Sequence, residues 1–161
     1  MAVNPDILEA LTTGIQSEVA SYVFYTEAAK QSKNDEFSKT LKELALEEKR
    51  HFQVLERQYD SLVRSEKWIS TADILKEEGL PEITEEMAEK HRALIDEVHG
   101  AADQRAVLDI ALRLEYEAFD HFKAMAEKAD SEEAKNTFDY LSKFEMTHVE
   151  IVKKMIASLD N

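Results

Sequence analysis

The sequence contains an internal repeat, which limits its fold to two similar halves. Shifting the chain against itself by 97 residues, without a gap, aligns acidic, imidazole, aromatic and aliphatic positions. The aligned pairs are Glu18 and Glu115, Glu48 and Glu145, His51 and His148, Tyr22 and Phe119, Tyr25 and Phe122, Thr40 and Thr137, and Leu44 and Leu141. Self-similarity at a fixed offset indicates that one structural unit occurs twice.

Each half has the pattern of a helical hairpin. Apolar side chains spaced by three and four residues predict helices over 5–31 and 35–61, and two more over 103–128 and 132–159. Asn4 followed by Pro5 is a typical helix start. The 3 glycines and 2 prolines in 161 residues are too few to separate many short strands. The predicted fold class is therefore all-α.

A long connection joins the two hairpins. Between residues 63 and 102 the apolar periodicity weakens, and Gly79 and Pro81 interrupt it. Short helices are predicted near 72–78 and over 84–100. We therefore expect a single domain over residues 1–161, in which a four-helix bundle consists of hairpins at 4–62 and 103–159 and a crossover at 63–102.

Charge and the lack of cysteine exclude several classes of function. The formal net charge is -14, which repels nucleic-acid phosphates and anionic membrane surfaces. No apolar stretch approaches the ~20 residues of a membrane span, and the first residues do not resemble a signal peptide, so a cytoplasmic location is expected. Without cysteine, disulfides, iron–sulfur clusters and cysteine nucleophiles are excluded. Any bound metal must use oxygen and nitrogen ligands.

The repeated glutamates are predicted to meet inside the bundle. Glu18 and Glu48 each lie 13 residues from the turn between their helices, and Glu115 and Glu145 have the same spacing in the second hairpin. At 1.5 Å per residue, each carboxylate is about 20 Å from its turn. All four continue apolar stripes, and each repeated histidine follows a glutamate by three residues, on the same side of its helix. The two hairpins can therefore gather four carboxylates and two imidazoles at one depth.

A cluster of this kind needs positive charge to be stable in a core. Burying a carboxylate is costly, and no lysine or arginine lies on these apolar stripes. Two divalent cations would balance four carboxylates, with the imidazoles as neutral donors. The predicted metal ligands are Glu18, Glu48, His51, Glu115, Glu145 and His148.

This ligand set resembles that of the ferritin-like di-iron carboxylate proteins, and most nearly their rubrerythrin-like branch. One glutamate from each of two helices, with a Glu-x-x-His pair from each of the other two, is the arrangement of that superfamily. Segment 45–51, ALEEKRH, also resembles the second helix of rubrerythrins. The resemblance implies a ferritin-like bundle with Glu48 and Glu145 as bridges between two metals, Glu18 and Glu115 as terminal or bridging ligands, and His51 and His148 as one nitrogen ligand per metal.

Two features depart from the rubrerythrin pattern. Rubrerythrins usually carry a rubredoxin-like iron domain built on four cysteines. This chain has no cysteine, so a separate electron-donor protein is expected. Rubrerythrins also carry a further glutamate one turn from the position of Glu115, where this chain has Leu112 and Ala118.

By the same resemblance, the expected function is the reduction of hydrogen peroxide or dioxygen at two iron ions. Oxygen-rich ligands with one imidazole per metal suit iron or manganese better than zinc, so iron is the first choice and manganese or a mixed pair the second. The main alternative is the oxidation and sequestration of ferrous iron, and a third is substrate hydroxylation. Ferritin cages use a short fifth helix after the fourth, and because 13 residues follow His148 in this sequence, a large cage is not expected. A homodimer is expected from the resemblance alone.

Other polar side chains have less specific interpretations. Tyr22 and Tyr25 lie one and two turns beyond Glu18, where core packing is preferred and a hydrogen bond to a ligand, or electron donation, is the alternative. The acidic runs, Glu47-Glu48 among them, are interpreted as solvated surface, with Glu48 as the exception. An exposed or locally paired imidazole is expected at the remaining histidines, His91, His99 and His121.

Overall fold

The computed structural model describes residues 3–77, 79 and 81–160. This part of the chain consists of helices and the loops between them, without a β-strand, so the all-α prediction is confirmed. The helices are α1 (Pro5–Gln31), α2 (Asp35–Ser65), α3 (Thr71–Leu75), α4 (Glu85–Glu89), α5 (Arg92–Gly100), α6 (Gln104–Lys128) and α7 (Glu132–Leu159). α1, α2, α6 and α7 form the bundle, and α3 to α5 belong to the crossover.

Side-chain caps begin all four long helices. The side-chain oxygen of Asn4 accepts a 2.9 Å hydrogen bond from the backbone N–H of Asp6, and Asn34, Asp103 and Ser131 cap α2, α6 and α7 in a similar way. Such caps satisfy backbone donors that have no partner within the helix. The starts of the long helices therefore follow directly from the sequence.

Two helix boundaries differ from the sequence prediction. α2 continues to Ser65, past the predicted end at Ser61, because the chain leaves the helix only at Glu66, where the backbone is left-handed with φ 58°. The single helix predicted over 84–100 is instead the pair α4 and α5, separated at His91. This break lets both short helices pack apolar side chains against α1.

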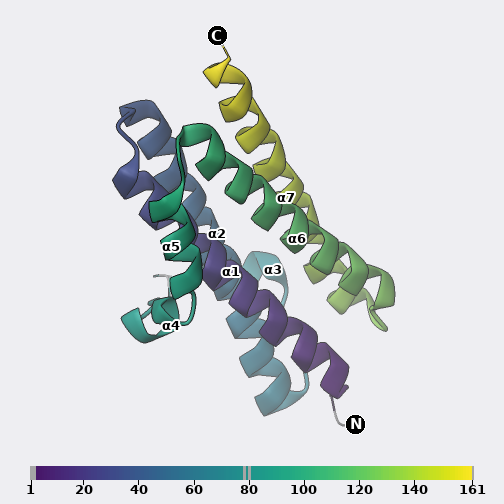
Figure 1. Cartoon of the computed structure of the whole chain (residues 1–161). Coiled ribbons are helices and arrows are strands. Elements are labelled where there is room, and N and C mark those ends of the chain that lie inside the picture. Colours follow the sequence, from purple (N-terminus) through teal and green to yellow (C-terminus); the bar gives the residue numbers. More distant parts are fainter. Residues whose placement is uncertain (1–2, 78, 80, 161) are drawn as a thin grey trace.

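The long helices form two antiparallel hairpins (Figure 1). α1 pairs with α2 and α6 pairs with α7, while α1 lies against α6 and α2 contacts α7. In the crossover, α3 packs on α2, and α4 and α5 pack on α1. Within the helix predicted near 72–78, α3 ends at Leu75, and residue 78 lies outside the described residues. The first hairpin is therefore the one that the crossover covers.

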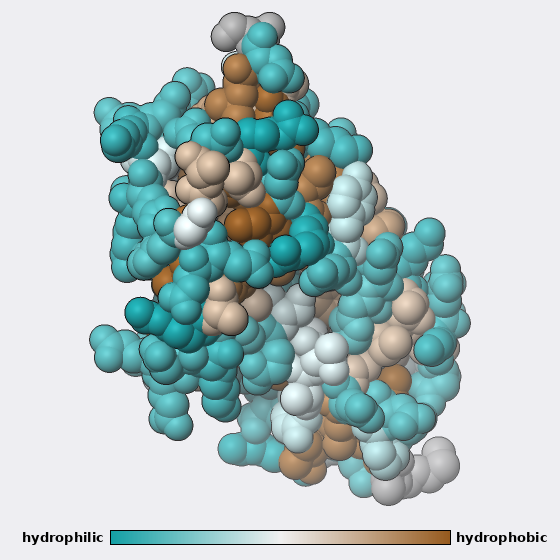
Figure 2. Space-filling view, in the orientation of Figure 1, coloured by the Kyte–Doolittle hydropathy of each residue, from teal (hydrophilic) through white to brown (hydrophobic). Residues whose placement is uncertain are grey.

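The surface is mostly hydrophilic on the face that Figure 2 shows. Figure 2 shows a face on which hydrophilic side chains predominate and apolar side chains form small separate groups. Within the described residues, no helix has the length and apolar character needed to cross a membrane.

Two apolar clusters lie on either side of the middle of the bundle. The first includes Phe24, Leu44, Leu108 and Val152, and the second includes Leu11, Leu55, Phe122 and Leu141. On every long helix, the repeated glutamate lies between a residue of the first cluster and a residue of the second. The glutamates are therefore enclosed by apolar layers above and below.

Gly14 lets α1 approach α6 closely. A Cβ atom at this position would lie 2.9 Å from Cε1 of Phe122 and 3.2 Å from Cδ1 of Leu55, and both side chains are fully buried. Gly14→Ala is expected to lower the free energy of unfolding by about 1–3 kcal/mol through overpacking, which outweighs the ~0.5–1 kcal/mol that alanine contributes to a helix. Urea unfolding measures the change. Gly100→Ala is the control, because nothing lies within 4 Å of a Cβ there, and an equal response of both variants would contradict the packing argument.

Candidate metal centre

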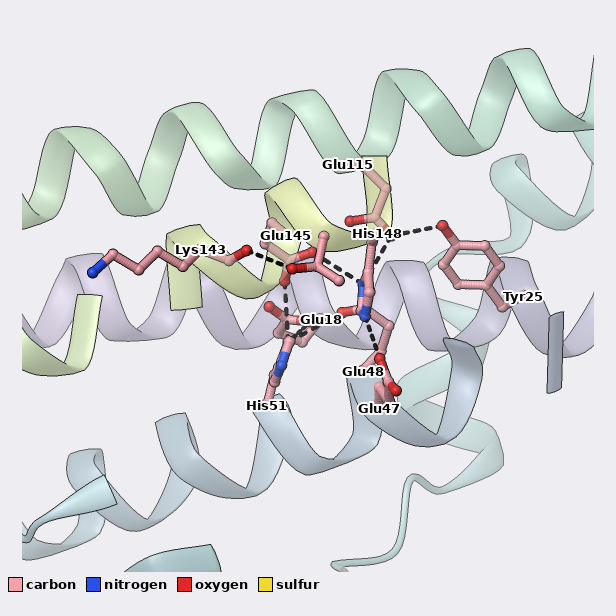
Figure 3. Close-up of polar contacts among 10 residues, drawn as sticks. Glu18, Tyr25, Glu47, Glu48, His51, Glu115, Lys143, Glu145 and His148 are labelled. Carbon is pink, nitrogen blue, oxygen red and sulfur yellow. Dashed lines mark hydrogen bonds and ion pairs between the residues drawn. The ribbon is translucent and has the colours of Figure 1, made fainter. Parts of the chain in front are cut away.

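Six side chains from the four long helices meet in the middle of the bundle (Figure 3). α1 supplies Glu18, α2 supplies Glu48 and His51, α6 supplies Glu115, and α7 supplies Glu145 and His148. Each of these residues is at most 1% exposed. We call this group the cage. The structure thus brings together all six residues that the repeat singled out.

The cage contains two overlapping groups of candidate ligands. One consists of Glu18, Glu48, His51 and Glu145, and the other of Glu48, Glu115, Glu145 and His148. In each group the candidate ligand atoms all lie within 4.8 Å of one another. Glu48 and Glu145 belong to both groups, which is the arrangement that carboxylate bridges between two neighbouring metal ions require.

Each histidine contacts a glutamate of the other hairpin. Nδ1 of His148 lies 2.8 Å from Oε1 of Glu48, and Nδ1 of His51 lies 3.2 Å from Oε1 of Glu145. The two rings are stacked, with centroids 5.7 Å apart and an interplanar angle of 16°. Nδ1 of both imidazoles therefore faces the carboxylates.

The buried carboxylate oxygens fit a pair of bound cations because they lack donors. Both oxygens of Glu18, and one oxygen each of Glu48, Glu115 and Glu145, have no hydrogen-bond partner among the described residues. A buried polar atom without a partner costs about 1–3 kcal/mol, and a charged one costs more. Divalent cations would satisfy all of these oxygens, and oxygen ligands with one imidazole per group suit iron or manganese.

Without metal, the cage retains protons. Burial, followed by the charges of Glu145 and Glu48, raises the pKa of Glu18 well above its usual value, and burial next to Glu48 does the same to the pKa of Glu115. Burial also opposes the charge on Glu48, but the contacts with its neighbours, the imidazole of His148 at 2.8 Å among them, lower its pKa to about 2. Burial likewise opposes a charged His51, yet its hydrogen bonds to carboxylates raise its pKa to about 9. Metal ions must displace these protons.

The metal-free protein is expected to lose stability as the pH rises from 6.5 to about 9. In this window folded His51 keeps a proton, because its pKa is about 9, whereas the unfolded chain releases that proton near pH 6.5. Since the folded state binds more protons, the free energy of unfolding falls with rising pH. The raised pKa of Glu18 acts in the same direction above pH 4.5.

Urea unfolding with a chelator present, at pH 6.5 and pH 9, measures this effect. The expected loss at the higher pH is on the order of 1–3 kcal/mol. The metal-loaded protein should not show it, because its ligands are already deprotonated. The raised pKa of His148 acts in the same direction, so equal free energies of unfolding at the two pH values in the chelated protein would show that neither imidazole of the cage holds an additional proton.

Tyr25 contacts the cage, whereas Tyr22 packs against the apolar clusters. The hydroxyl of Tyr25 donates a 2.6 Å hydrogen bond to Oε1 of Glu115, and the ring is fully buried. Tyr25 therefore combines the two sequence-based interpretations, since it packs in the core and also bonds a predicted ligand. Tyr22 is half-buried, with Nζ of Lys49 5.6 Å from its ring centroid.

Glu47 is a contact that the sequence prediction missed. A solvated side chain was expected there, but Oε2 of Glu47 lies 2.6 Å from Nε2 of His148. This hydrogen bond lowers the pKa of the Glu47 carboxyl, and the Glu47 side chain is still 39% exposed. No local pattern reveals the contact, because the two residues are 101 positions apart. The available signal was a break in the repeat, since Phe144 occupies the position aligned with Glu47.

The other three histidines lie outside the cage. His99 is exposed, with Nε2 2.6 Å from Oε1 of Glu27, as expected for a locally paired imidazole. Nε2 of His121 lies 3.2 Å from the backbone oxygen of Ala10. His91 differs from the expectation, because it is half-buried at the break between α4 and α5 and its Nε2 has no hydrogen-bond partner among the described residues.

α6 brings a single carboxylate to the cage, within the described part of the chain. Leu112 and Ala118, one turn to either side of Glu115, pack in the two apolar clusters instead. Where rubrerythrins carry a further glutamate, this chain therefore surrounds Glu115 with apolar side chains.

A cavity of about 660 Å³ opens beside His51. Its walls include His51, Arg50, Glu47, Tyr140 and Phe144. The ring of Phe144 stands edge-on to the imidazole of His51, with centroids 5.2 Å apart. The cavity therefore reaches the outer side of the His51 ring, while the cage glutamates do not line it.

Comparisons with known proteins agree with this geometry. Among solved structures, a hypothetical protein from Pyrococcus furiosus has a similar fold, with a TM-score of 0.65 and 23% sequence identity over 94% of this chain and 88% of that chain. Comparison with curated proteins finds no match. The Rubrerythrin family model matches residues 9–156, a range that contains all six cage residues. That match spans nearly the whole chain, and the four long helices carry one glutamate on each of α1 and α6 and a Glu-x-x-His pair on each of α2 and α7. This chain therefore belongs to the rubrerythrin family of ferritin-like di-iron proteins.

Proposed function

We propose that the cage binds two iron ions and reduces hydrogen peroxide or dioxygen with electrons from a separate donor. The observation that carries this proposal is the group of four buried glutamates and two histidines, whose carboxylate oxygens lack other partners. Membership of the rubrerythrin family supports it. The cavity beside His51 gives a small oxidant room to approach.

The two ligand groups divide the cage residues between two metal positions. Glu48 and Glu145 would bridge the metals, since both groups share them. Glu18 would complete one position and Glu115 the other, each with the histidine of its group. Two divalent cations balance four carboxylates, so the loaded cage adds no net charge to the core.

Iron is proposed ahead of manganese or a mixed pair, because the function is a redox reaction at oxygen-rich ligands. Iron bound in the ferrous state would supply two electrons, enough with two protons to convert one hydrogen peroxide molecule into two water molecules. The chain contributes the surroundings: apolar clusters on both sides exclude bulk water, and Tyr25 orients Glu115. No cysteine is present to hold a second iron centre, so the proposed electron donor is another protein.

The function is tested by loading the protein anaerobically with two ferrous ions per chain and mixing it with peroxide or dioxygen. Stopped-flow absorption then follows the formation of ferric iron. The proposal predicts rapid oxidation at one equivalent of oxidant, and repeated turnover when a reductant is added. Glu48→Ala should lose the fast phase, whereas Glu43→Ala, on an exposed turn of the same helix, should keep it.

Storage of iron is the competing function that the same measurement separates. Faster oxidation by dioxygen than by peroxide, followed by uptake of many more ferrous ions per chain, would support ferrous iron oxidation and sequestration. Light scattering of the product would then show large iron-filled particles. A protein that returns to two ions per chain after each turnover would support the reductase.

A further inference from the structure

The two halves of the cage differ in the side chains that contact their histidines. In the repeat, Glu47 aligns with Phe144, and each directly precedes a cage glutamate. Glu47 lies on α2 but contacts His148 of α7, and Phe144 lies on α7 but contacts His51 of α2. Each histidine is therefore supported by the other hairpin, one by a carboxylate and the other by an aromatic ring.

On the first side, the imidazole of His148 is held at both ring nitrogens. Nε2 lies 2.6 Å from Oε2 of Glu47, and Nδ1 lies 2.8 Å from Oε1 of Glu48. With Nε2 donating its proton to Glu47, the lone pair of Nδ1 is left for a metal ion. A carboxylate in this position fixes the tautomer and the orientation of the ring and increases its strength as a ligand.

On the second side, the imidazole of His51 has no carboxylate beyond the cage. Every polar contact that the structure gives His51, among the described residues, runs through Nδ1 toward cage glutamates. Its outer surroundings are the ring of Phe144, the ring of Tyr140 at 6.2 Å between centroids, and the cavity of about 660 Å³. Aromatic edges restrict the position of the imidazole but do not select its tautomer.

From this difference we propose that Glu47 is a positioning residue that makes the metal position at His148 the tighter of the two. The inference rests on the proposed metal centre and adds an order of filling: the first ion binds at the His148 position and the second at the His51 position. The cavity then lies next to the more weakly held ion. Outer carboxylates on ligating histidines typically change metal affinity by about 10- to 100-fold, which is enough to separate two binding steps.

Anaerobic titration with cobalt(II), followed by calorimetry and by visible absorption, tests this order. The unaltered protein should bind two ions in two steps of different affinity. Glu47→Ala should weaken the tighter step about 10- to 100-fold and change the weaker step little. Glu43→Ala, one turn earlier on the same helix and exposed, should leave both steps unchanged. If Glu47→Ala also leaves both steps unchanged while two ions still bind, the inference is wrong and the metal centre stands.

Histidine backgrounds separate positioning from a general effect on the fold. In His148→Ala, adding Glu47→Ala should cause little further loss of affinity, because the carboxylate has no imidazole to hold. In His51→Ala, adding Glu47→Ala should weaken the remaining binding step as much as it weakens the tighter step of the unaltered protein. Equal losses in both backgrounds would overturn the inference. Glu47→Gln keeps a hydrogen-bond acceptor without the charge, so its affinity at the tighter step should lie between those of Glu47→Ala and the unaltered protein. Absence of any cobalt binding by the unaltered protein would instead refute the proposed metal centre.

Discussion

Glu48→Ala is expected to abolish the binding of both metal ions. Glu48 belongs to both ligand groups and lies 2.8 Å from Nδ1 of His148, so its removal takes one ligand from each position and unbalances the charge of both. Metal analysis after anaerobic loading and gel filtration should give two ions per chain for the unaltered protein and close to none for the variant.

Glu18→Ala provides the matched comparison, because Glu18 belongs to one group only. This variant should lose or weaken the ion at the His51 position and retain the other. Circular dichroism of the metal-free variants shows whether the helices are intact. Two firmly bound ions in Glu48→Ala would contradict the assignment of this residue as a bridge.

Glu18→Leu is expected to stabilise the metal-free protein while it impairs metal binding. Both carboxylate oxygens of Glu18 are buried without a hydrogen-bond partner among the described residues, and burial raises its pKa. Leucine has a similar volume and no polar atom to leave unpaired. The free energy of unfolding of the chelated protein should therefore rise by about 1–3 kcal/mol.

The opposite result is expected when metal is present. Saturating ferrous or manganous ions should raise the melting temperature of the unaltered protein more than that of Glu18→Leu, because binding to the folded state adds stability. Glu9→Leu is the control, since Glu9 is exposed on the same helix and should change stability by less than about 0.5 kcal/mol. If Glu18→Leu is less stable than the unaltered protein in chelator, this carboxylate stabilises the metal-free fold, and the argument that its burial is costly is wrong.

The cage could be predicted from the sequence because its geometry depends on helix spacing alone. Glu18 and Glu48 lie equally far from their turn, and the repeat carries that spacing into the second hairpin. A rise of 1.5 Å per residue is nearly invariant in helices, so equal counts place side chains at equal depth. The helix starts were predictable for a related reason, since capping residues such as Asn4 and Asp103 act on their own neighbours.

The contacts around the cage could not be predicted, because they depend on how the hairpins face each other. Glu47 reaches His148 and Tyr25 reaches Glu115 across long stretches of sequence, and no local pattern states which faces meet. The crossover was misjudged at His91 for the same reason. Its break follows from the packing of α4 and α5 on α1, which outweighs the helical periodicity of the segment.

Anomalous diffraction at the iron absorption edge, from crystals of the anaerobically iron-loaded protein, tests the central claim most directly. Two peaks about 3.5–4 Å apart should lie between the carboxylates of Glu48 and Glu145, one on the side of His51 and one on the side of His148. If the crystals show anomalous iron peaks only outside the cage, the di-metal centre is contradicted.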